Sequence, residues 1–512
     1  MGRRLVRDQG LPALLAERAM TERARSPRVV IVGAGMSGIA MGVALKRHGF
    51  EDFVMLEKGS DVGGTWYWNH YPGLSCDVPS QLYQYSFHLK PDWKRVFATG
   101  EEILGYHREV VDSFGLRPHL RLDAEVTRSE WTGEEWEVEV DGEVERADFV
   151  VMATGVLHHP NVPDIPGLAG FAGTTLHSAR WDDGVDYAGK RVAVIGTGST
   201  GVQLVSAMQP TAEQVTLFSR SPQWVLWGPT EMRQPALVSD LMRRVPFLNR
   251  LVFEGLLQTS WLFTDIVTRP SWRRRLLQES ARRRLASVKD ARLRERITPD
   301  YEPLCKRQVV SGSFLSAIQQ ENVEVVTERI DHVRAEGIVT QDAKARDFDL
   351  IALATGFKAH NYMCPLDLVG RDGLSIDEAW ADGPRAYRMS AIPGFPNLFT
   401  ILGPNSPVGS LPLHHAAELS SAYIVRWLER FARGELATVE PTEKATAEFN
   451  SQVAMALGPT VWNTGCNSWY QRDDGTIDLW PFNRADMNRM LGEPDDSHFH
   501  IRRPAEVAAT AG

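Results

Sequence analysis

The 512-residue chain has few cysteines, and the four that it has are far apart. No two of them are spaced as Cys-x-x-Cys, so the pattern argues against a disulfide framework, a structural zinc site and a dithiol reductase. We therefore expect neither a metal site nor a disulfide framework. The cysteines are Cys76, Cys305, Cys364 and Cys466.

The chain also lacks an apolar segment long enough to span a bilayer. Its most apolar stretch, residues 255–263, contains Gln258 and lies between Glu254 and Asp265. Residues 1–27 carry positive charges but no apolar core followed by a small-residue cleavage site, so we expect a polar extension and not a signal peptide. A cytoplasmic location without a transmembrane segment is the default expectation.

An excess of positive charge is absent as well. The chain has 56 Lys and Arg against 65 Asp and Glu, a net charge of −9, which argues against nucleic acid as a partner. Residues 269–296 are rich in arginine, but Leu, Glu and Asp are interleaved with the arginines at helical spacing. We interpret this stretch as a solvated helix face, and contact with a membrane or an anionic partner is the less favoured alternative.

The chain does contain two copies of the Gly-x-Gly-x-x-Gly fingerprint, which cradles the pyrophosphate of a dinucleotide. Each copy follows an apolar strand pattern and opens a helical pattern that leads to a second strand. The first two glycines permit a tight turn and close approach of the pyrophosphate, and the third lets the helix pack on the strand. Two glycine turns in an ordinary parallel sheet are the alternative. The glycines are Gly33, Gly35 and Gly38, and then Gly196, Gly198 and Gly201.

A charged residue follows the first glycine of each copy at the same distance of 24 residues, and the two charges are opposite. The carboxylate of Glu57 suits ribose hydroxyls, whereas the guanidinium of Arg220 suits a ribose 2′-phosphate. Two different nucleotides are therefore predicted, and the second is NADP, although Arg220 alone would more often be a solvated strand-end charge. Ser199, in the second fingerprint, and Ser221, beside Arg220, belong to the same expected site.

Two similar strand ends, residues 149–155 and 350–356, both break at Ala-Thr-Gly and enclose the second fingerprint. This is the pattern of one domain inserted into another. The predicted fold class is α/β with two Rossmann-like dinucleotide-binding domains, the second inserted in the first. A strand-free stretch, about residues 228–297, predicts a helical excursion from the inserted domain that would cover the active site.

Two further motifs resemble those of type I Baeyer–Villiger monooxygenases. Residues 171–182 match the family's Phe-x-Gly-x-x-x-His-x-x-x-Trp-Asp fingerprint, with His177 and Trp181 at its His and Trp positions. Residues 63–77 match a second signature that runs from paired glycines through Trp and Tyr-Pro-Gly to Asp. The resemblance extends from residue 29 to about residue 481. The residues of the second signature expected at the flavin are Gly64, Thr65, Trp66 and Asp77.

The resemblance implies a class B flavoprotein monooxygenase that uses FAD, NADPH and O2. Such enzymes reduce FAD with NADPH, add dioxygen to form a C4a-peroxyflavin, and insert one oxygen atom beside a ketone carbonyl to give an ester or lactone. By the same resemblance, residues 28–156 and 351–512 form the FAD-binding domain and residues 157–350 the NADPH-binding domain. A small-molecule ketone is the expected substrate.

The resemblance also assigns roles to charged residues. The peroxide must remain anionic, and an arginine beside it would stabilise that charge because arginine does not lose its proton. Arg307 is the expected cation for this task and for polarising the carbonyl, and Asp77 is expected to hold it by an ion pair. Lys306 is expected to bind the 2′-phosphate together with Arg220. A surface Lys-Arg doublet and a turn aspartate are the alternative.

Other residues of the resemblance are expected to act by position. His177 is taken as a structural hinge residue that affects NADPH handling, and not as a general base. Trp469, within the C-terminal segment 462–470, is expected on a mobile loop that closes over nicotinamide and substrate. The substrate pocket is expected to form from the helical excursion, residues 407–415 and this loop.

Three other functions remain open on the sequence alone. A flavin-dependent N- or S-oxygenase is the nearest, although such enzymes usually lack the Trp-Asp ending of the first motif. A flavin disulfide reductase would need a redox cysteine pair, and no pair has that spacing. An NADPH-binding redox sensor is the third. An enzyme would consume oxygen in a fixed ratio to the product that it forms, and a sensor would not.

Overall fold

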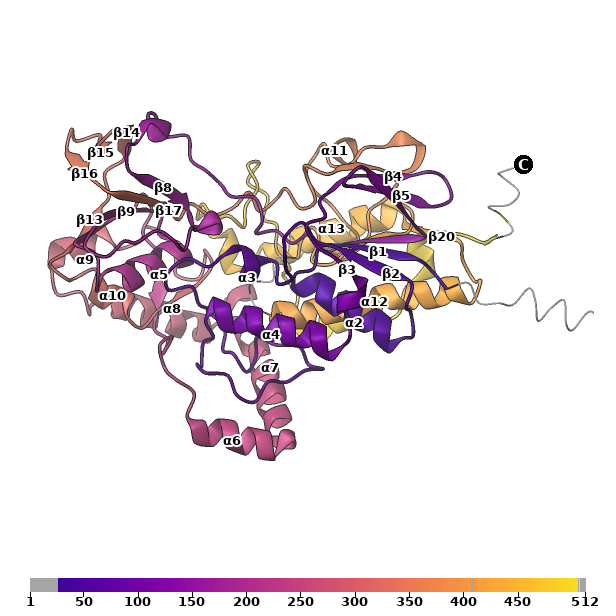
Figure 1. The fold of residues 1–512 in the computed structure, drawn as a ribbon. Coiled ribbons are helices and arrows are strands. Elements are labelled where there is room, and N and C mark those ends of the chain that lie inside the picture. The colour runs from indigo at the N-terminus through magenta and orange to yellow at the C-terminus, as the bar shows by residue number, and fades with distance from the viewer. Residues whose placement is uncertain (1–25, 407–408, 410, 505, 507–512) are drawn as a thin grey trace, which may run out of the picture.

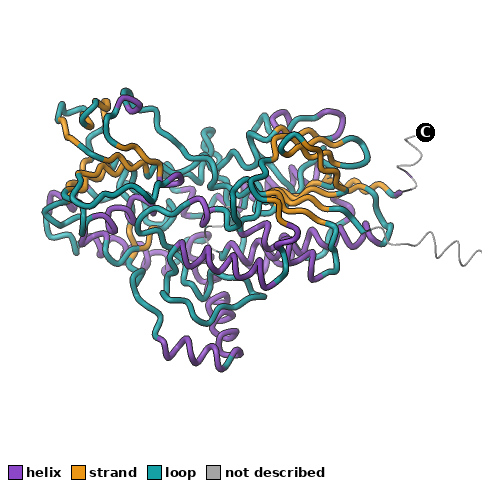
Figure 2. The backbone as a smooth tube through the Cα atoms, in the orientation of Figure 1, coloured by secondary structure: helices purple, strands orange, loops and turns teal. Residues whose placement is uncertain are grey.

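Two five-stranded parallel sheets organise the chain, whose computed structural model describes residues 26–406, 409, 411–504 and 506. Figures 1 and 2 show them on opposite sides of the molecule. The first sheet has the order β19-β7-β1-β2-β3. Its central strands are buried apolar runs, as expected for a parallel sheet covered on both faces. The strands are β1 (Val29–Val32), β2 (Phe53–Leu56), β3 (Leu120–Arg121), β7 (Phe149–Met152) and β19 (Leu398–Thr400).

The second sheet repeats this design with the order β13-β10-β9-β17-β8. All its pairings are parallel, and β9 lies between β10 and β17 as β1 lies between β2 and β7. The second Ala-Thr-Gly break therefore ends a strand of this sheet, whereas the first ends a strand of the other. The strands are β8 (Thr174–His177), β9 (Arg191–Ile195), β10 (Gln214–Phe218), β13 (Val323–Val326) and β17 (Leu350–Leu353).

Helices and a smaller sheet complete the first unit. Helix α2 (Met36–Arg47) packs against the long helix α12 (Leu413–Ala432), and both lie on one face of the first sheet. The smaller sheet has the order β18-β4-β5-β6 and buries alternate residues of β5. The remaining elements are α3 (Thr65–Trp68), α4 (Gly100–Ser113), β4 (Val126–Trp131), β5 (Trp136–Val140), β6 (Glu143–Ala147), β18 (Asp367–Val369), α11 (Ile376–Ala379), β20 (Thr438–Pro441), α13 (Glu443–Leu457), α14 (Arg484–Met490) and β21 (Phe499–Arg502).

The second unit carries a helical excursion that leaves and re-enters through a two-stranded ribbon. Strand β11 (Val225–Leu226) pairs with β12 (Val309–Val310), and four helices lie between them. Figure 1 shows α6 and the adjoining part of α7 projecting away from the rest of the molecule. The helices are α6 (Ala236–Arg244), α7 (Pro246–Thr268), α8 (Trp272–Leu285) and α9 (Ala291–Arg296), and the unit also contains α5 (Ser199–Met208), α10 (Phe314–Ala317), β14 (Ile330–Arg334), β15 (Gly337–Thr340) and β16 (Ala345–Asp347).

The chain passes between the two units twice, and the two crossings lie side by side. Pro160 forms an antiparallel bridge with Phe357. The N–H of Asn161 donates to the Gly356 carbonyl at 2.8 Å, and that of Lys358 to the His159 carbonyl at 2.9 Å.

No helix among the described residues combines the length and the apolarity needed to cross a bilayer.

Candidate active site

A cavity of about 2530 Å³ lies between the two units and is lined by both glycine turns. Sites for single drug-sized ligands are typically about 300–1,000 Å³, so this cavity has room for two dinucleotides. Its wall includes residues of α7, of both crossings and of the C-terminal loop. Part of the expected pocket segment, residues 407, 408 and 410, lies outside the described residues, whereas Gly409 and Leu411 to Leu413 line the cavity.

The first glycine turn has the geometry that a bound pyrophosphate requires. Gly33 has a φ of +103°, in the region that favours glycine. A Cβ on Gly38 would lie 2.0 Å from the Gly33 carbonyl oxygen, so only glycine lets α2 start so close to β1. A Cβ on Gly35 would lie 3.2 Å from the Gly64 backbone. Helix α2 begins here without a side-chain cap, which leaves its first N–H groups for an anion.

Glu57 lies at the end of β2 on the wall of the same cavity. Its two oxygens accept hydrogen bonds from the backbone N–H groups of Ala34 and Gly59, each at 2.8 Å. Burial raises the pKa of Glu57, and these two N–H groups oppose that effect. The carboxylate is thus held in one orientation, and each oxygen retains a lone pair for a ribose hydroxyl.

The second glycine turn repeats the close approach of the third glycine to the first. Gly196 has a φ of +119°, and a Cβ on Gly201 would again lie 2.0 Å from the carbonyl oxygen of the first glycine. Gly198 has no neighbour within 4 Å of its Cβ position, so this turn is open to the cavity. Helix α5 begins at Ser199, also without a side-chain cap.

Two positively charged side chains lie near each other beyond the second glycine turn. Arg220 lines the cavity at the end of β10, and among the described residues no carboxylate pairs with it. Lys306, from the far side of the helical excursion, donates to Ser221 Oγ at 2.8 Å. Burial lowers the pKa of Lys306 and the nearby charge of Arg220 lowers it further, while Asp300 opposes both. This cluster of Arg220, Ser221 and Lys306 suits a phosphate dianion.

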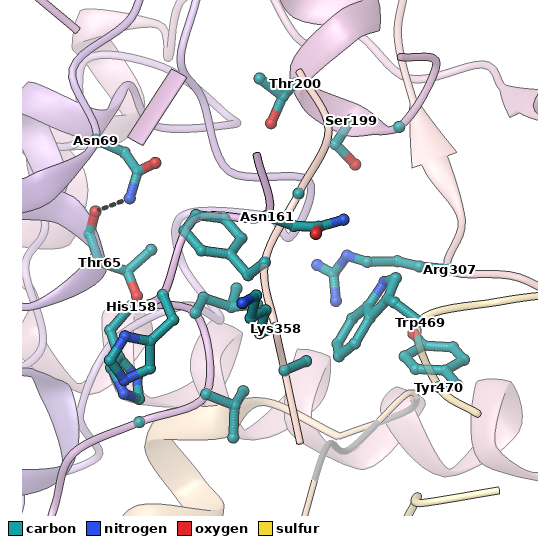
Figure 3. A pocket seen from close by; sticks show the side chains of 18 of the residues that line it. Thr65, Asn69, His158, Asn161, Ser199, Thr200, Arg307, Lys358, Trp469 and Tyr470 are labelled. Atoms are coloured by element: carbon teal, nitrogen blue, oxygen red, sulfur yellow. Dashed lines mark hydrogen bonds between the residues drawn. The ribbon is translucent and has the colours of Figure 1, made fainter. Parts of the chain in front are cut away.

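Arg307 forms a two-bond ion pair with Asp77. Its Nη2 donates to Oδ1 at 2.6 Å and its Nε to Oδ2 at 3.2 Å. The Asp77 side chain is 12% exposed, whereas 40% of the Arg307 side chain remains accessible. Because Arg307 lines the cavity, its free edge faces that space (Figure 3). The adjacent carboxylate raises the pKa of Arg307, although burial opposes it.

The C-terminal loop closes this part of the wall. Trp469 lies beside Arg307 in Figure 3, and its ring centroid is 4.5 Å from that of Tyr470. Burial raises the pKa of Tyr470, and the charge of Arg307 opposes the shift, so the phenol remains protonated. The sequence identified Trp469 from the resemblance but gave Tyr470 no role.

The same loop requires a correction to the expectation that the cysteines form no disulfide framework. Cys466 is bonded to Cys305, whereas Cys76 and Cys364 are free. The expectation was wrong because the two partners are 161 residues apart in sequence, and spacing carries no sign of their proximity. The bond joins the loop that carries Trp469 to the segment that carries Arg307.

The second signature, residues 63–77, lies where the two units meet. Thr65 and Trp66 line the cavity on α3, and Trp66 donates to the Tyr83 hydroxyl at 3.2 Å. The Tyr-Pro-Gly segment contacts α5: the Tyr71 hydroxyl donates to Gln203 Oε1 at 2.8 Å. A Cβ on Gly73 would lie 2.8 Å from the Gln203 carbonyl, which explains the glycine.

His177 and Trp181 lie away from the cavity wall. His177 ends β8, its Nδ1 accepts from the Ala179 N–H at 3.1 Å, and its ring meets Phe357 of the return crossing edge-on. Trp181 is buried in the core of the second unit. Both therefore support the region next to the crossings and do not face the reacting space.

Several cavity residues on the crossings escaped sequence reasoning. His158, Asn161 and Lys358 line the cavity and are labelled in Figure 3. Burial, with help from the charges of His159, Lys58 and Arg180, lowers the pKa of His158 to about 3, so this imidazole is neutral. The available signal was the pair of Ala-Thr-Gly breaks, because polar residues just beyond parallel strand ends face the ligand side of a sheet.

Two glycine turns on one cavity, with an acidic side chain beside the first and a basic one beside the second, are typical of an oxidoreductase that binds a flavin and a nicotinamide dinucleotide. Residues 30–235 match a family model described as pyridine nucleotide-disulphide oxidoreductase. An uncharacterized monooxygenase of Mycobacterium tuberculosis (strain H37Rv) is 46% identical, over 95% of this chain and 98% of its own. A Baeyer–Villiger monooxygenase of Streptomyces coelicolor is 38% identical, over 94% of each chain. The structure of OTEMO in complex with FAD and NADP superimposes with a TM-score of 0.84 at 26% identity, covering 93% of this chain and all of that one.

The chain belongs to the Baeyer–Villiger monooxygenase family. Its cofactors are FAD and NADPH, and it is an NADPH- and O2-dependent flavin monooxygenase. The predicted fold class, two dinucleotide-binding folds in one α/β chain, is confirmed. No observation favours an N- or S-oxygenase.

Proposed function

We propose that this enzyme inserts one oxygen atom beside the carbonyl of a small ketone to give an ester or lactone, with Arg307 as the cation at the reacting centre. The observation that carries the proposal is the Arg307–Asp77 pair on the wall shared by both glycine turns. We assign FAD to the unit built on β1 and NADPH to the unit built on β9. The pairing of β17 with β8 and β9 supports including that strand, Leu350–Leu353, in the NADPH-binding unit.

The bound cofactors supply the electrons that activate dioxygen, and the protein supplies charge, orientation and shelter. Arg307 presents a permanent positive charge to the cavity, and such a charge stabilises negative charge that develops next to it, more strongly where water is excluded. Asp77 occupies two of the guanidinium donors and so fixes the direction of the others. We therefore assign Asp77 as a positioning residue.

NADPH selection is assigned to Arg220, Ser221 and Lys306. Their two cations and one hydroxyl offer donors to a 2′-phosphate, and NADH has no group to occupy them. Glu57, on the other unit, offers an anion where a phosphate would be repelled. The two sites therefore sort the two dinucleotides by charge.

The C-terminal loop is assigned to water exclusion over the reacting centre. Trp469 and Tyr470 present aromatic surface next to Arg307. Expelling water there strengthens the interaction of Arg307 with developing negative charge and shields that charge from solvent. His177 and Trp181 are assigned to the hinge region next to the crossings.

The test is the Arg307→Ala variant, assayed with NADPH, O2 and a panel of linear, cyclic and aryl ketones. FAD content and flavin reduction by NADPH should persist, while ester formation should fall by about 100-fold or more, as for loss of an oxyanion-stabilising donor. Gas chromatography identifies the product, and a thioether and a tertiary amine assayed in parallel report S- or N-oxygenation.

Arg502→Ala is the matched control, because Arg502 is exposed on β21 and far from the cavity wall. It should leave all activities unchanged. Ester formation by Arg307→Ala at the wild-type rate would remove Arg307 from the reacting centre. Oxygenation of the amine or thioether without any ester from the wild type would replace the proposed reaction.

A further inference from the structure

The helical excursion exposes an unusual amount of apolar surface. Eleven of the fourteen large apolar side chains that are exposed in the described part of the chain lie between Trp227 and Leu276. Leu237 is 79% exposed and Phe247 is 74% exposed. Apolar patches of this kind on a folded surface mark sites that contact another apolar phase.

Helix α6 buries little of its apolar surface against the described part of the chain. Met242 alone of its residues is buried. Leu237, Val238 and Leu241 are spaced to share one face of the helix, and that face is exposed. A helix normally gains its stability by burying such a face, and no described part of the chain covers this one.

The start of α7 also exposes apolar side chains. Phe247 and Leu251, one turn apart, are exposed on its first two turns, and the exposed Val245 connects the two helices. We call these six residues the apolar tip; Figure 1 shows that α6 and the start of α7 project farthest from the two sheets. The tip comprises Leu237, Val238, Leu241, Val245, Phe247 and Leu251.

Arginines accompany the tip in an otherwise acidic protein. Residues 231–254 contain four Arg against three Asp and Glu, a net charge of +1 in a chain whose total is −9. Arg244, at the end of α6, is exposed and makes no ion pair with any described residue. Arg233, just before α6, is likewise exposed and makes no ion pair with any described residue.

From these observations we propose that α6 and the start of α7 dock on the surface of an anionic lipid bilayer. Apolar side chains on one face with arginines beside them are the composition of helices that lie in the membrane interface. Anionic headgroups complement the exposed guanidinium groups of Arg233 and Arg244. A symmetric contact between two copies would instead bring the same arginines together, which argues for lipid over a second chain.

Helix α7 connects this surface with the active site. Leu256, Thr259 and Phe263, farther along the helix, line the cavity. Docking would therefore place one wall of the cavity near the bilayer, where lipophilic ketones concentrate. This last step rests on the proposed function, whereas the docking surface itself does not.

The experiment is sedimentation of the full-length holoenzyme with phosphatidylcholine vesicles, prepared with and without phosphatidylglycerol. The wild type should pellet with the anionic vesicles, and less so at high salt, because salt screens the charges. The double variant Leu237→Glu/Phe247→Glu should lose this binding. Arg244→Glu should weaken it without altering the apolar face.

Met455→Glu is the matched control for the apolar changes, because Met455 is 72% exposed on α13, away from the excursion. Arg502→Glu is the control for charge. Both should bind vesicles as the wild type does. Circular dichroism and FAD content establish that each variant is folded.

Three results would overturn the docking surface: no sedimentation of the wild type, equal sedimentation of the double variant, or a wild-type dimer in light scattering that the double variant converts to a monomer. Oxidation of a water-soluble ketone without vesicles should be equal in the wild type and the double variant. Vesicle binding that depends on the tip, in a protein that oxidises no ketone, would refute the proposed function and leave the docking surface standing.

Discussion

Arg220 and Arg307 face the same cavity in different surroundings. Arg307 is held by two hydrogen bonds from its guanidinium to a mostly buried carboxylate, whereas Arg220 makes no ion pair among the described residues. A paired arginine has a fixed direction, as a group acting on a small reacting centre requires. An unpaired one retains its donors for an incoming anion.

We predict that Arg220→Ala weakens NADPH binding by about 10- to 100-fold, the usual cost of losing hydrogen bonds to a charged group. NADH binding should change little, because NADH carries no 2′-phosphate. Fluorescence titration of both coenzymes measures the ratio, and Arg502→Ala serves as the control. Equal losses for NADPH and NADH would show that Arg220 contacts a part common to both.

At this scale the sequence was informative where a motif fixed the spacing. The 24-residue offset identified Glu57 and Arg220, and both lie on the cavity. For His158 and Lys358 the only signal was their place just beyond the two Ala-Thr-Gly breaks, and their approach to each other depends on two crossings that become neighbours after folding.

At the scale of elements, the two glycine turns share one feature that brings each helix close to its strand. In each, the third glycine of the fingerprint lies against the carbonyl of the first. The helix can then begin close enough to its strand for its first N–H groups to reach a pyrophosphate. A methyl group at that position would have to displace the backbone at the first glycine.

We predict opposite effects for two glycine-to-alanine changes. Gly201→Ala places a Cβ 2.0 Å from the Gly196 carbonyl oxygen and should lower stability by about 1–3 kcal/mol, with weaker NADPH binding. Gly255→Ala, on α7 with nothing within 4 Å of its Cβ, should raise stability by about 0.5–1 kcal/mol. Thermal melting of the holoenzyme compares the two, and a lower Tm for Gly255→Ala or an unchanged one for Gly201→Ala would contradict the prediction.

Element positions followed well from the sequence because strand, turn and helix patterns are local. The two expected strand ends at 149–155 and 350–356 are those of β7 and β17, and the strand-free stretch from about 228 to 297 holds α6 to α9. The exposed face of α6 did not follow, because an amphipathic pattern does not reveal whether its apolar side meets the protein. Pairing of Cys305 with Cys466 was missed for the same reason, since it is a property of tertiary contact.

At the scale of the whole molecule, a buried histidine pair ties stability to pH. His107 on α4 and His414 on α12 are fully buried, and their Nε2 atoms are 3.2 Å apart. Burial lowers the pKa of His107 to about 4, and burial with the neighbouring His107 places that of His414 well below its usual value. The folded protein thus keeps these rings neutral where the unfolded chain would protonate them.

We therefore predict that stability falls as the pH drops from about 6.5, the unfolded value, to about 4, the folded value of His107. Over this window the unfolded state binds more protons, so acidification favours unfolding, and the loss is complete below the folded pKa. Melting temperatures across this range measure it. His107→Gln should show a shallower slope than the wild type, and the exposed His500→Gln should not; identical slopes for all three would refute the assignment.

The insertion of one domain into another was predictable because both Ala-Thr-Gly breaks are written in the sequence. The assignment of each strand to its sheet needed the structure, since β17 pairs with strands that precede it by more than 150 residues. A cytoplasmic location stays a prediction.

The disulfide between Cys305 and Cys466 changes the mechanics of the two units. The backbone connects them at two places, but these run side by side at Pro160 and Phe357, so together they act as a single hinge line. Cys305 belongs to the inserted unit and Cys466 to the loop of the other, and their bond is a third covalent attachment near Arg307. An attachment away from that line limits how far the two units can rotate about it. Reduction of this one bond would leave the units covalently connected along the hinge line alone.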